Sequence, residues 1–298
     1  MDMIKPSISI VMATYNRSDL LEIQLQAFEK QSISVFQYEI VIVNDGSKDN
    51  TEEVLEFWTS KLPNLRYHTQ KNSGPAVARN KGVELARGEI IAFTDDDCIV
   101  DPRWLAIIQH RFQNKEINVI EGQTYTDRLK RTPFTHQIEN KKWNPVIPTC
   151  NAAYRKSFFN QIGGFDESFP FAHNEDTDLA WRVLEISEVI FDKNMKVFHP
   201  PIPVSFKSQL NRMKMLSSEF ILFNKNPEAY KKWRTNNPWT TIYKEVFIKH
   251  QFLNLKFHLG FYRNPTLMIK GVFLSLGWWF YLVKLLPDFI QHSKLKRN

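Results

Sequence analysis

Residues 89–97 join a run of strand-forming residues to three consecutive carboxylates, Asp95, Asp96 and Asp97. Adjacent Asp side chains repel one another, and a bound divalent cation would remove this repulsion. Hard oxygen ligands suit Mg²⁺ or Mn²⁺, and Mg²⁺ is usually held by one or two carboxylates together with substrate phosphates. The stretch therefore predicts a metal–diphosphate site at the end of a strand. The alternative is a polar turn in which one Asp caps a helix that begins near Pro102.

The sequence around these carboxylates predicts the scaffold that holds them. Four short stretches are typical of strands, and helical patterns lie between them. The predicted strands are 7–14, 39–43, 65–68 and 89–94, and the helices begin near Ser18, Asn50 and Pro75. Because strands and helices alternate, we expect an α/β fold with a mostly parallel sheet, flanking helices and right-handed crossovers.

Three of the predicted strands end in polar residues. Thr14, Tyr15 and Asn16 close the first strand, Asp45 follows the second, and the three carboxylates follow the fourth. In open α/β sheets, ligands bind beyond the carboxyl ends of the strands, so these groups should meet at one edge. Their convergence predicts a nucleotide-like ligand.

Residues 72–80 predict a helix start that an anion can approach. Ser73 or Gly74 can cap this helix, with Pro75 in its first turn. Small residues there let a phosphate reach the backbone N–H groups, and Arg79 could add a charged contact. The alternative is an ordinary amphipathic helix with a solvated Arg79.

Residues 173–178 open another predicted helix with the sequence His-Asn-Glu-Asp-Thr-Asp. The helix dipole favours acidic residues in a first turn, so capping is one explanation. Glu175, Asp176 and a third acid exceed what capping requires, and a carboxylate held near the metal could serve as a general base. The strand predicted over 188–199 ends in His199, which is either a metal ligand or a structural side chain.

A helix predicted over 102–112 and a strand over 119–125 precede a loop-like stretch, residues 126–148. A long loop beside an active site often handles the second substrate or acts as a lid. Trp143 could stack on a sugar there or anchor the loop.

Length and composition set broad limits. With 298 residues, 43% of them hydrophobic, the chain can form one large α/β domain with an appendage or two modest domains. The two cysteines, Cys98 and Cys150, offer no disulfide framework, so we expect a reducing compartment. Residues 1–9 contain no apolar stretch long enough for a signal peptide.

Charge is distributed unevenly along the chain. The net charge is +7, but residues 201–298 contain 16 Lys and Arg against 4 Asp and Glu, which leaves the remainder acidic. A basic, aromatic tail suggests an anionic partner, either membrane lipid or nucleic acid, although a merely solvated surface can have this composition. Nucleic acid is the weaker candidate, because no recognised motif accompanies the basic residues.

Residues 272–283 are almost wholly apolar, and Lys270 and Lys284 bracket this run with 13 residues between them. A spanning helix needs about 20 apolar residues, so the run is predicted to be too short to span. Trp, Tyr and Lys prefer the membrane interface, which predicts that residues 268–290 lie on an anionic bilayer. The alternative is a helix packed on the rest of the chain or on a second subunit of a homo-oligomer.

Taken together, several segments resemble the family 2 glycosyltransferases, which have the GT-A fold. The resemblance covers residues 5–200 and depends on the order and spacing of its parts. Those parts are 11–16 (VMATYN), 43–47 (VNDGS), 72–74 (NSG), 78–80 (ARN), 95–97 (DDD), 163–167 (GGFDE) and 175–179 (EDTDL).

The resemblance implies transfer of a sugar from a nucleotide donor with inversion at the anomeric carbon. It implies that Asp97 binds the metal directly, with Asp95 and His199 as further ligands, and that Asp176, paired with Glu175, is the base. Asp45 would accept a hydrogen bond from the uracil ring if the donor carries UDP. The resemblance places Thr14, Asp45 and Arg79 at the nucleotide. The full set of residues predicted to bind the nucleotide is Thr14, Tyr15, Asn16, Asp45, Gly74, Arg79, Asp95 and Asp96. Since the middle residue of the Asp-x-Asp motif is also an Asp, the choice between Asp96 and Asp97 as metal ligand stays open.

These features predict a nucleotide-sugar-binding GT-A domain over 1–204 and a helical basic, aromatic extension over 205–298. The expected activity is a Mn²⁺- or Mg²⁺-dependent, inverting transfer from a nucleotide sugar, with UDP favoured, to a hydroxyl of a glycan or lipid-linked acceptor in polysaccharide or cell-surface glycan synthesis. The expected location is the cytoplasmic face of a membrane, with peripheral attachment. The alternatives are an inactive nucleotide-sugar-binding partner of another transferase and a nucleotidyltransferase.

Overall fold

The computed structural model describes residues 5–294, which form two compact units. The first, here called the sheet unit, comprises the chain up to Thr126 together with Gln137–Pro200. The second, the helical unit, comprises Asp127–His136 together with the chain from Pro201 onward. The predicted domains, 1–204 and 205–298, stay a prediction, because compact packing alone does not show independent folding.

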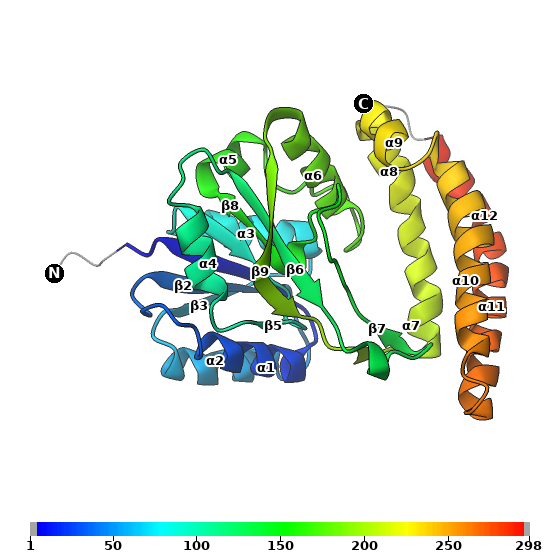
Figure 1. Ribbon diagram of the computed structural model, residues 1–298, viewed down its shortest axis with the longest axis horizontal. Coiled ribbons are helices and arrows are strands. Elements are labelled where there is room, and N and C mark those ends of the chain that lie inside the picture. The colour runs from blue at the N-terminus through cyan, green and yellow to red at the C-terminus, as the bar shows by residue number, and fades with distance from the viewer. Residues whose placement is uncertain (1–4, 295–298) are drawn as a thin grey trace. The chain divides into compact units, whose positions relative to one another are not determined.

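An eight-stranded mixed sheet forms the centre of the sheet unit (Figure 1). Its strands are β1 (Ile8–Thr14), β2 (Tyr38–Asn44), β3 (Leu65–Thr69), β4 (Ile90–Phe93), β5 (Ile99–Val100), β6 (Val119–Tyr125), β8 (Ala152–Arg155) and β9 (Val189–Phe198). They lie in the order β3-β2-β1-β4-β8-β6-β9-β5. The first four in this order are parallel, whereas β8 is antiparallel to β4 and β6, and β5 is antiparallel to β9. The predicted α/β class is confirmed.

Strands β1 and β2 consist mostly of apolar residues, and both faces of the sheet are covered there. Every residue of β2 is buried, and Ile10 of β1 pairs in register with Ile40. Parallel strands that are buried on both faces have this composition. The strands predicted over 7–14, 39–43, 65–68, 89–94, 119–125 and 188–199 are confirmed. Strands β5 and β8 were not predicted, because two and four residues are too short to show a period.

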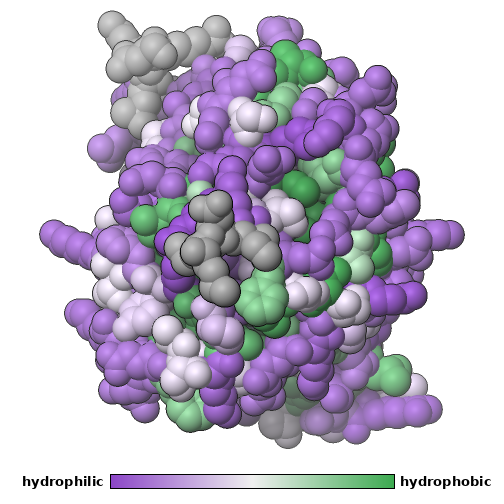
Figure 2. Space-filling model, turned by 90° about the vertical axis from the view of Figure 1, so that its left-hand side faces the viewer, coloured by the Kyte–Doolittle hydropathy of each residue, from purple (hydrophilic) through white to green (hydrophobic). Residues whose placement is uncertain are grey.

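Helices cover both faces of the sheet (Figure 1). On one face lie α1 (Ser18–Phe28), α2 (Thr51–Lys61) and α4 (Trp104–Arg111), which share a core with residues such as Ile10 and Ile40. On the other lie α3 (Pro75–Leu85), α5 (Lys156–Gln161) and α6 (Glu175–Ile186), which pack with Val11 and Val41. The short helix η2 (Thr149–Asn151) precedes β8. The surface in view in Figure 2 is mostly hydrophilic, with apolar residues in small patches.

The helical unit has its own apolar core, which includes Phe220, Leu282 and Phe289. Strands β7 (Thr135–His136) and β10 (Ile202–Pro203) pair antiparallel in it, so a segment of the predicted 126–148 loop belongs to this unit. Its helices are η1 (Arg128–Lys130), α7 (Phe206–Asn211), η3 (Arg212–Ser217), α8 (Ser218–Lys225), α9 (Pro227–Trp233), the π-helical η4 (Thr240–His250), α10 (Gln251–Leu259), α11 (Pro265–Lys284) and α12 (Leu286–Ser293).

Helix α11 is longer than the apolar run from which its segment was predicted. It has 20 residues and, by length and composition alone, could cross a membrane. The prediction that this segment is too short to span is therefore wrong on length, because the helix continues through Lys270 to Pro265. Length alone does not distinguish a spanning helix from one that lies on a surface.

Candidate active site

Asp45, directly after β2, organises the loop that leads into α3. Its carboxylate accepts hydrogen bonds from the Gln70 side chain (2.8 Å) and from the backbone N–H groups of Ser73 and Gly74 (both 2.9 Å). Gly74 has a φ of +95°, in the region that favours glycine, and it immediately precedes the helix. A carboxylate can accept about four hydrogen bonds. Asp45 therefore positions the start of α3 and keeps acceptor capacity for a ligand.

The loop after β1 lies against the loop after β2. The Asn16 side chain accepts a hydrogen bond from the backbone N–H of Lys48 (2.7 Å). The backbone N–H of Asn16 donates to Ser47 Oγ (2.9 Å). Asn16 has a left-handed φ of +53°, which Asn tolerates better than most residues. Tyr15 beside it is 44% exposed, so its ring is available to a ligand.

Asp96 points back toward β1. Thr14 Oγ1 donates to Asp96 Oδ2 (2.7 Å), and the Arg17 guanidinium contacts Asp96 Oδ1 (2.9 Å). Burial raises the pKa of Asp96 to about 6, against the opposing effect of Arg17. The middle carboxylate of the triplet is therefore engaged by the protein itself.

Arg17 is a site residue that the sequence analysis missed. Its Nη1 atom also lies 2.7 Å from Asp97 Oδ2, so one guanidinium contacts two of the three carboxylates. The Arg17 side chain is 46% exposed, and the residue lies in the loop between β1 and α1. The signal that could have found it is charge balance, since three adjacent acids require nearby cations.

Asp97 faces His199 at the end of β9. His199 Nδ1 lies 3.0 Å from the Pro200 carbonyl oxygen, which can only accept, so Nδ1 carries the proton. The other ring nitrogen, Nε2, lies 3.7 Å from Asp97 Oδ1. Asp97, His199 and the Cys98 thiol bring their potential ligand atoms within 4.8 Å of one another, and all three residues are buried. A carboxylate oxygen and an imidazole nitrogen fit Mn²⁺ or Mg²⁺ when further oxygen ligands come from a substrate.

Arg79 connects Asp95, the first carboxylate of the triplet, to helix α6. Its Nη2 lies 3.1 Å from Asp95 Oδ1 and its Nη1 lies 2.8 Å from Glu175 Oε1. Arg79 is only 7% exposed, so the alternative of a solvated Arg79 is wrong. Removing one partner from a buried ion pair leaves an uncompensated charge, which usually costs about 3–5 kcal/mol. Arg79 thus holds β4 and α6 in a fixed relation.

The three acids in the first turn of α6 have different environments. Glu175 is buried on Arg79, and Asp178 is buried beside Arg182, with 2.7 Å between Asp178 Oδ2 and the Arg182 Nη2 atom. Asp176 is less buried, and its Oδ1 accepts a hydrogen bond from the Thr177 N–H (2.7 Å). Asn174 before them has a φ of +75° and begins the helix. Capping therefore does not explain all three acids, because two of them belong to ion pairs.

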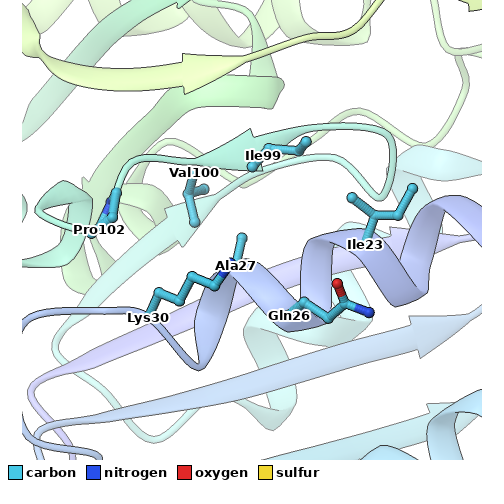
Figure 3. Close-up of a pocket in the computed structure, with 7 residues that line it drawn as sticks. All are labelled: Ile23, Gln26, Ala27, Lys30, Ile99, Val100 and Pro102. Atoms are coloured by element: carbon cyan, nitrogen blue, oxygen red, sulfur yellow. The ribbon is translucent and has the colours of Figure 1, made fainter.

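An apolar cavity of about 220 Å³ lies between α1 and β5 (Figure 3). Its lining residues are Ile23, Gln26, Ala27, Lys30, Ile99, Val100 and Pro102. None of these side chains is a carboxylate or carries the predicted chemistry. We therefore assign the candidate active site to the strand ends and not to this cavity.

Residues 137–148 are fixed to the sheet beside this site. The Asn140 side chain donates to Glu121 Oε1 of β6 (2.6 Å), and the Asn140 N–H donates to the Thr124 carbonyl (3.0 Å). Trp181 of α6 donates from Nε1 to the Pro145 carbonyl (3.0 Å). This part of the predicted loop is therefore bonded to both β6 and α6.

Glu121 should make stability depend on pH. Burial raises its pKa from 4.5 to about 7, although hydrogen bonds such as that from Asn140 oppose the shift. The folded state then holds this proton more tightly than the unfolded state, so the free energy of unfolding falls as pH rises from about 4.5 to about 7, by at most about 3 kcal/mol. Glu121→Gln should unfold in urea like the wild type near pH 5 and be more stable than it near pH 8. A difference that is equal at both pH values would contradict this assignment.

The structure brings most predicted site residues into three connected groups. One group links Thr14, Asp96, Arg17, Asp97 and His199. A second links Asp95, Arg79 and Glu175, with Asp176 next in the chain, and a third links Asp45 to Gly74. The nucleotide, metal and catalytic roles of these residues stay predictions, because contacts among side chains do not show a bound ligand.

A Rossmann-like sheet flanked by helices, with acidic residues after its strands, defines the GT-A class of transferases. Solved structures of this class share the fold. The mannosyltransferase PcManGT from Pyrobaculum calidifontis in complex with GDP-Man and Mn²⁺ has a TM-score of 0.62 at 17% identity, covering 95% of this chain and 88% of that one. S. aureus TarS 1–349 in complex with UDP has a TM-score of 0.57 at 17% identity, covering 97% and 93%.

The chain belongs to glycosyl transferase family 2, whose domain matches residues 9–174. It is similar to the glycosyltransferase AglE of Haloferax volcanii, with 32% identity over 170 residues. That match covers 54% of this chain and 56% of AglE, so this chain spans little more than half of that relative. Family membership confirms the predicted resemblance and shows that the protein is a glycosyltransferase.

Proposed function

We propose that the protein transfers a sugar from a UDP-sugar to a hydroxyl of a glycan or lipid-linked acceptor, with inversion, in the synthesis of a polysaccharide or another cell-surface glycan. One observation carries this proposal. Arg79 joins Asp95 to the acidic start of α6. Asp95 is close in sequence to Asp97, which with His199 forms the candidate metal site. A carboxylate cluster suited to a diphosphate and a separate acid suited to proton transfer are thus held in one rigid arrangement.

The donor nucleotide would lie at the ends of β1 and β2. Asp45 keeps acceptor capacity for a base N–H, and the exposed ring of Tyr15 offers a surface for stacking. TarS was solved with UDP and PcManGT with GDP-Man, so nucleotide preference differs between proteins of this fold. We favour UDP because the resemblance pairs this Asp with the uracil ring.

Asp97 and His199 would hold a divalent cation, Mn²⁺ or Mg²⁺, with Asp95 as a further ligand. When bound, such an ion offsets the charge that develops on a departing diphosphate. Arg17 would assist, since its half-exposed guanidinium can contact phosphate oxygens as readily as the carboxylates it contacts here.

Asp176 would act as the general base. Its carboxylate is oriented by the Thr177 N–H and lies next to Glu175, which Arg79 fixes in place. Asp176 accepts the proton of the acceptor hydroxyl while that oxygen attacks the anomeric carbon on the face opposite the leaving diphosphate. Attack from the opposite face produces inversion. Positioning both groups around one carbon supplies much of the rate.

The two alternatives make different products. An inactive binding partner would bind nucleotide without turnover, and a nucleotidyltransferase would release diphosphate, whereas the proposed enzyme releases a nucleoside diphosphate. The presence of Asp45, Asp97 and Asp176 together argues against an inactive partner, since an inactive protein has no need of a base.

A thermal-shift screen of nucleotides and nucleotide sugars, with and without Mn²⁺, tests the proposal. A ligand at 100 times its Kd stabilises the folded state by about 2.7 kcal/mol. We expect UDP and UDP-sugars to raise the Tm when Mn²⁺ is present and to have little effect with a chelator. Mn²⁺ alone is the control. If no nucleoside diphosphate raises the Tm with Mn²⁺, the proposed donor site is wrong.

A further inference from the structure

Helix α11 presents an unpartnered apolar stripe on the surface of the helical unit. Ile269, Phe273, Leu276, Phe280 and Val283 are all exposed, and their spacing of three or four residues puts them on one side of the helix. Phe280 is 72% exposed and Phe273 62%, which is unusual for aromatic side chains. We call these five residues the α11 stripe.

Helix α10 extends this apolar surface. Phe252 and Leu253 are 60% and 58% exposed, and the Phe252 ring lies 5.6 Å from the ring of Trp279 on α11. Exposed apolar side chains therefore continue from one helix onto its neighbour. Contiguous exposed apolar surface of this kind marks an interaction site.

The opposite side of α11 packs within the helical unit. Leu274, Trp278 and Leu282 are buried there, and Ser275 Oγ is 2.9 Å from Nδ1 of His258 on α10. Trp278 Nε1 donates to the Gln209 carbonyl of α7 (3.2 Å). Helices that carry exposed lysines, such as α10 with Lys256, cover this side of α11. The helix therefore suits a position along a bilayer surface better than a position across it.

The chain segment that carries the stripe has Lys and Arg but no acidic residue. Residues 246–287 contain no Asp or Glu, and their five basic residues are all exposed. These are Lys249, Lys256, Arg263, Lys270 and Lys284. Lys249 pairs with Glu245, just before this stretch (2.8 Å). Exposed apolar side chains on a segment whose Lys and Arg residues are exposed are complementary to an anionic bilayer, which is apolar inside and negatively charged at its surface.

We propose that this side of α10 and α11 docks on an anionic lipid bilayer, with the α11 stripe among the acyl chains and the basic residues at the headgroup phosphates. Each Lys or Arg near such a surface contributes about fivefold in affinity. A second copy of the chain is the weaker partner, because a two-fold interface would place the same cations opposite one another. The proposal concerns the helical unit alone and does not depend on the proposed transfer reaction.

Vesicle flotation with the full chain tests this proposal. Vesicles of phosphatidylcholine alone are compared with vesicles that also contain phosphatidylglycerol. We expect the wild type to bind the anionic vesicles at least tenfold more tightly and to be released by high salt, because salt screens surface charges. Equal binding to both vesicle types, or resistance of the bound protein to high salt and alkaline washing, would overturn the proposal of an interfacial, charge-assisted contact.

Two double variants separate the apolar and charged contributions. Phe273→Ser with Phe280→Ser should abolish binding, and Lys270→Glu with Lys284→Glu should weaken it by roughly 20-fold or more. Phe36→Ser and Lys115→Glu, at exposed positions of the sheet unit, are the matched controls and should bind like the wild type. Wild-type binding by both double variants would overturn the proposal. A second result would also overturn it: sedimentation shows a dimer for the wild type and a monomer for the Phe273→Ser, Phe280→Ser variant, and the wild type does not bind vesicles. A second copy of the chain would then occupy the stripe.

Discussion

Replacing Asp176 by Asn should lower the rate of sugar transfer by about 10²–10⁴-fold while leaving nucleotide binding within about twofold of the wild type. Asn has nearly the same shape and can still accept the hydrogen bond from the Thr177 N–H. It cannot take the proton of an acceptor hydroxyl. The expected result is thus a loss of kcat without a loss of UDP affinity, measured by product release and by titration calorimetry.

Asp19 offers a matched control for this substitution. It is an exposed acid at the second position of α1, as Asp176 is at the second position of α6. Asp19→Asn therefore makes the same change in net charge and in the interaction with a helix dipole. It should retain full transfer activity. Unchanged transfer by Asp176→Asn would remove this residue as the base, and equal losses in both variants would point to a structural effect.

Glu175 shows why the sequence alone could not separate the two acids of this pair. Both residues are carboxylates in one helical turn, and either could face a substrate. The structure distinguishes them by partner, because Glu175 contacts Arg79, a residue 96 positions earlier in the chain. A contact over that separation leaves no local pattern in the sequence. Glu175 is accordingly a positioning residue in the proposed mechanism.

The parallel half of the sheet was predictable because its strands are uniform. Apolar runs such as 40–43 are buried on both faces, and the composition of such strands is distinctive. Polar residues at their ends then indicated the site, since strand order fixes which ends meet. Strand β8 lacked this signal, because its four residues follow a long irregular segment and pair antiparallel.

Arg17 and the helical unit show two further limits of local patterns. In the sequence, Arg17 is only one polar residue after a predicted strand, and its contacts with Asp96 and Asp97, about eighty residues away, reveal its position. Helix α11 looked too short to span because only the apolar run between Lys270 and Lys284, its C-terminal part, was counted. The pairing of residues 135–136 with 202–203 could not be foreseen from either segment. Each of these features depends on tertiary contacts.

Substitution of Asp97 by Asn should remove the dependence of nucleotide binding on Mn²⁺ and lower transfer by roughly 10²–10³-fold, because stabilising a leaving diphosphate is worth several kcal/mol. The reason lies in its position. Asp97 is the carboxylate beside His199, within the cluster whose ligand atoms lie within 4.8 Å. Binding of Mn²⁺ can be followed without turnover by the loss of the electron paramagnetic resonance signal of the free ion.

Asp96→Asn is the decisive comparison, since it makes the same charge change one residue earlier. Asp96 faces Thr14, and an Asn there can still accept the Thr14 hydrogen bond. We expect this variant to bind Mn²⁺ nearly as the wild type does, with a smaller loss of transfer from its weakened contact with Arg17. If Asp96→Asn instead lost Mn²⁺ and Asp97→Asn kept it, the two roles would be exchanged. Such an outcome would require Asp96 to leave its present partners when the ion binds, because Arg17 Nη1 now lies 2.9 Å from Asp96 Oδ1 and Thr14 Oγ1 lies 2.7 Å from Asp96 Oδ2.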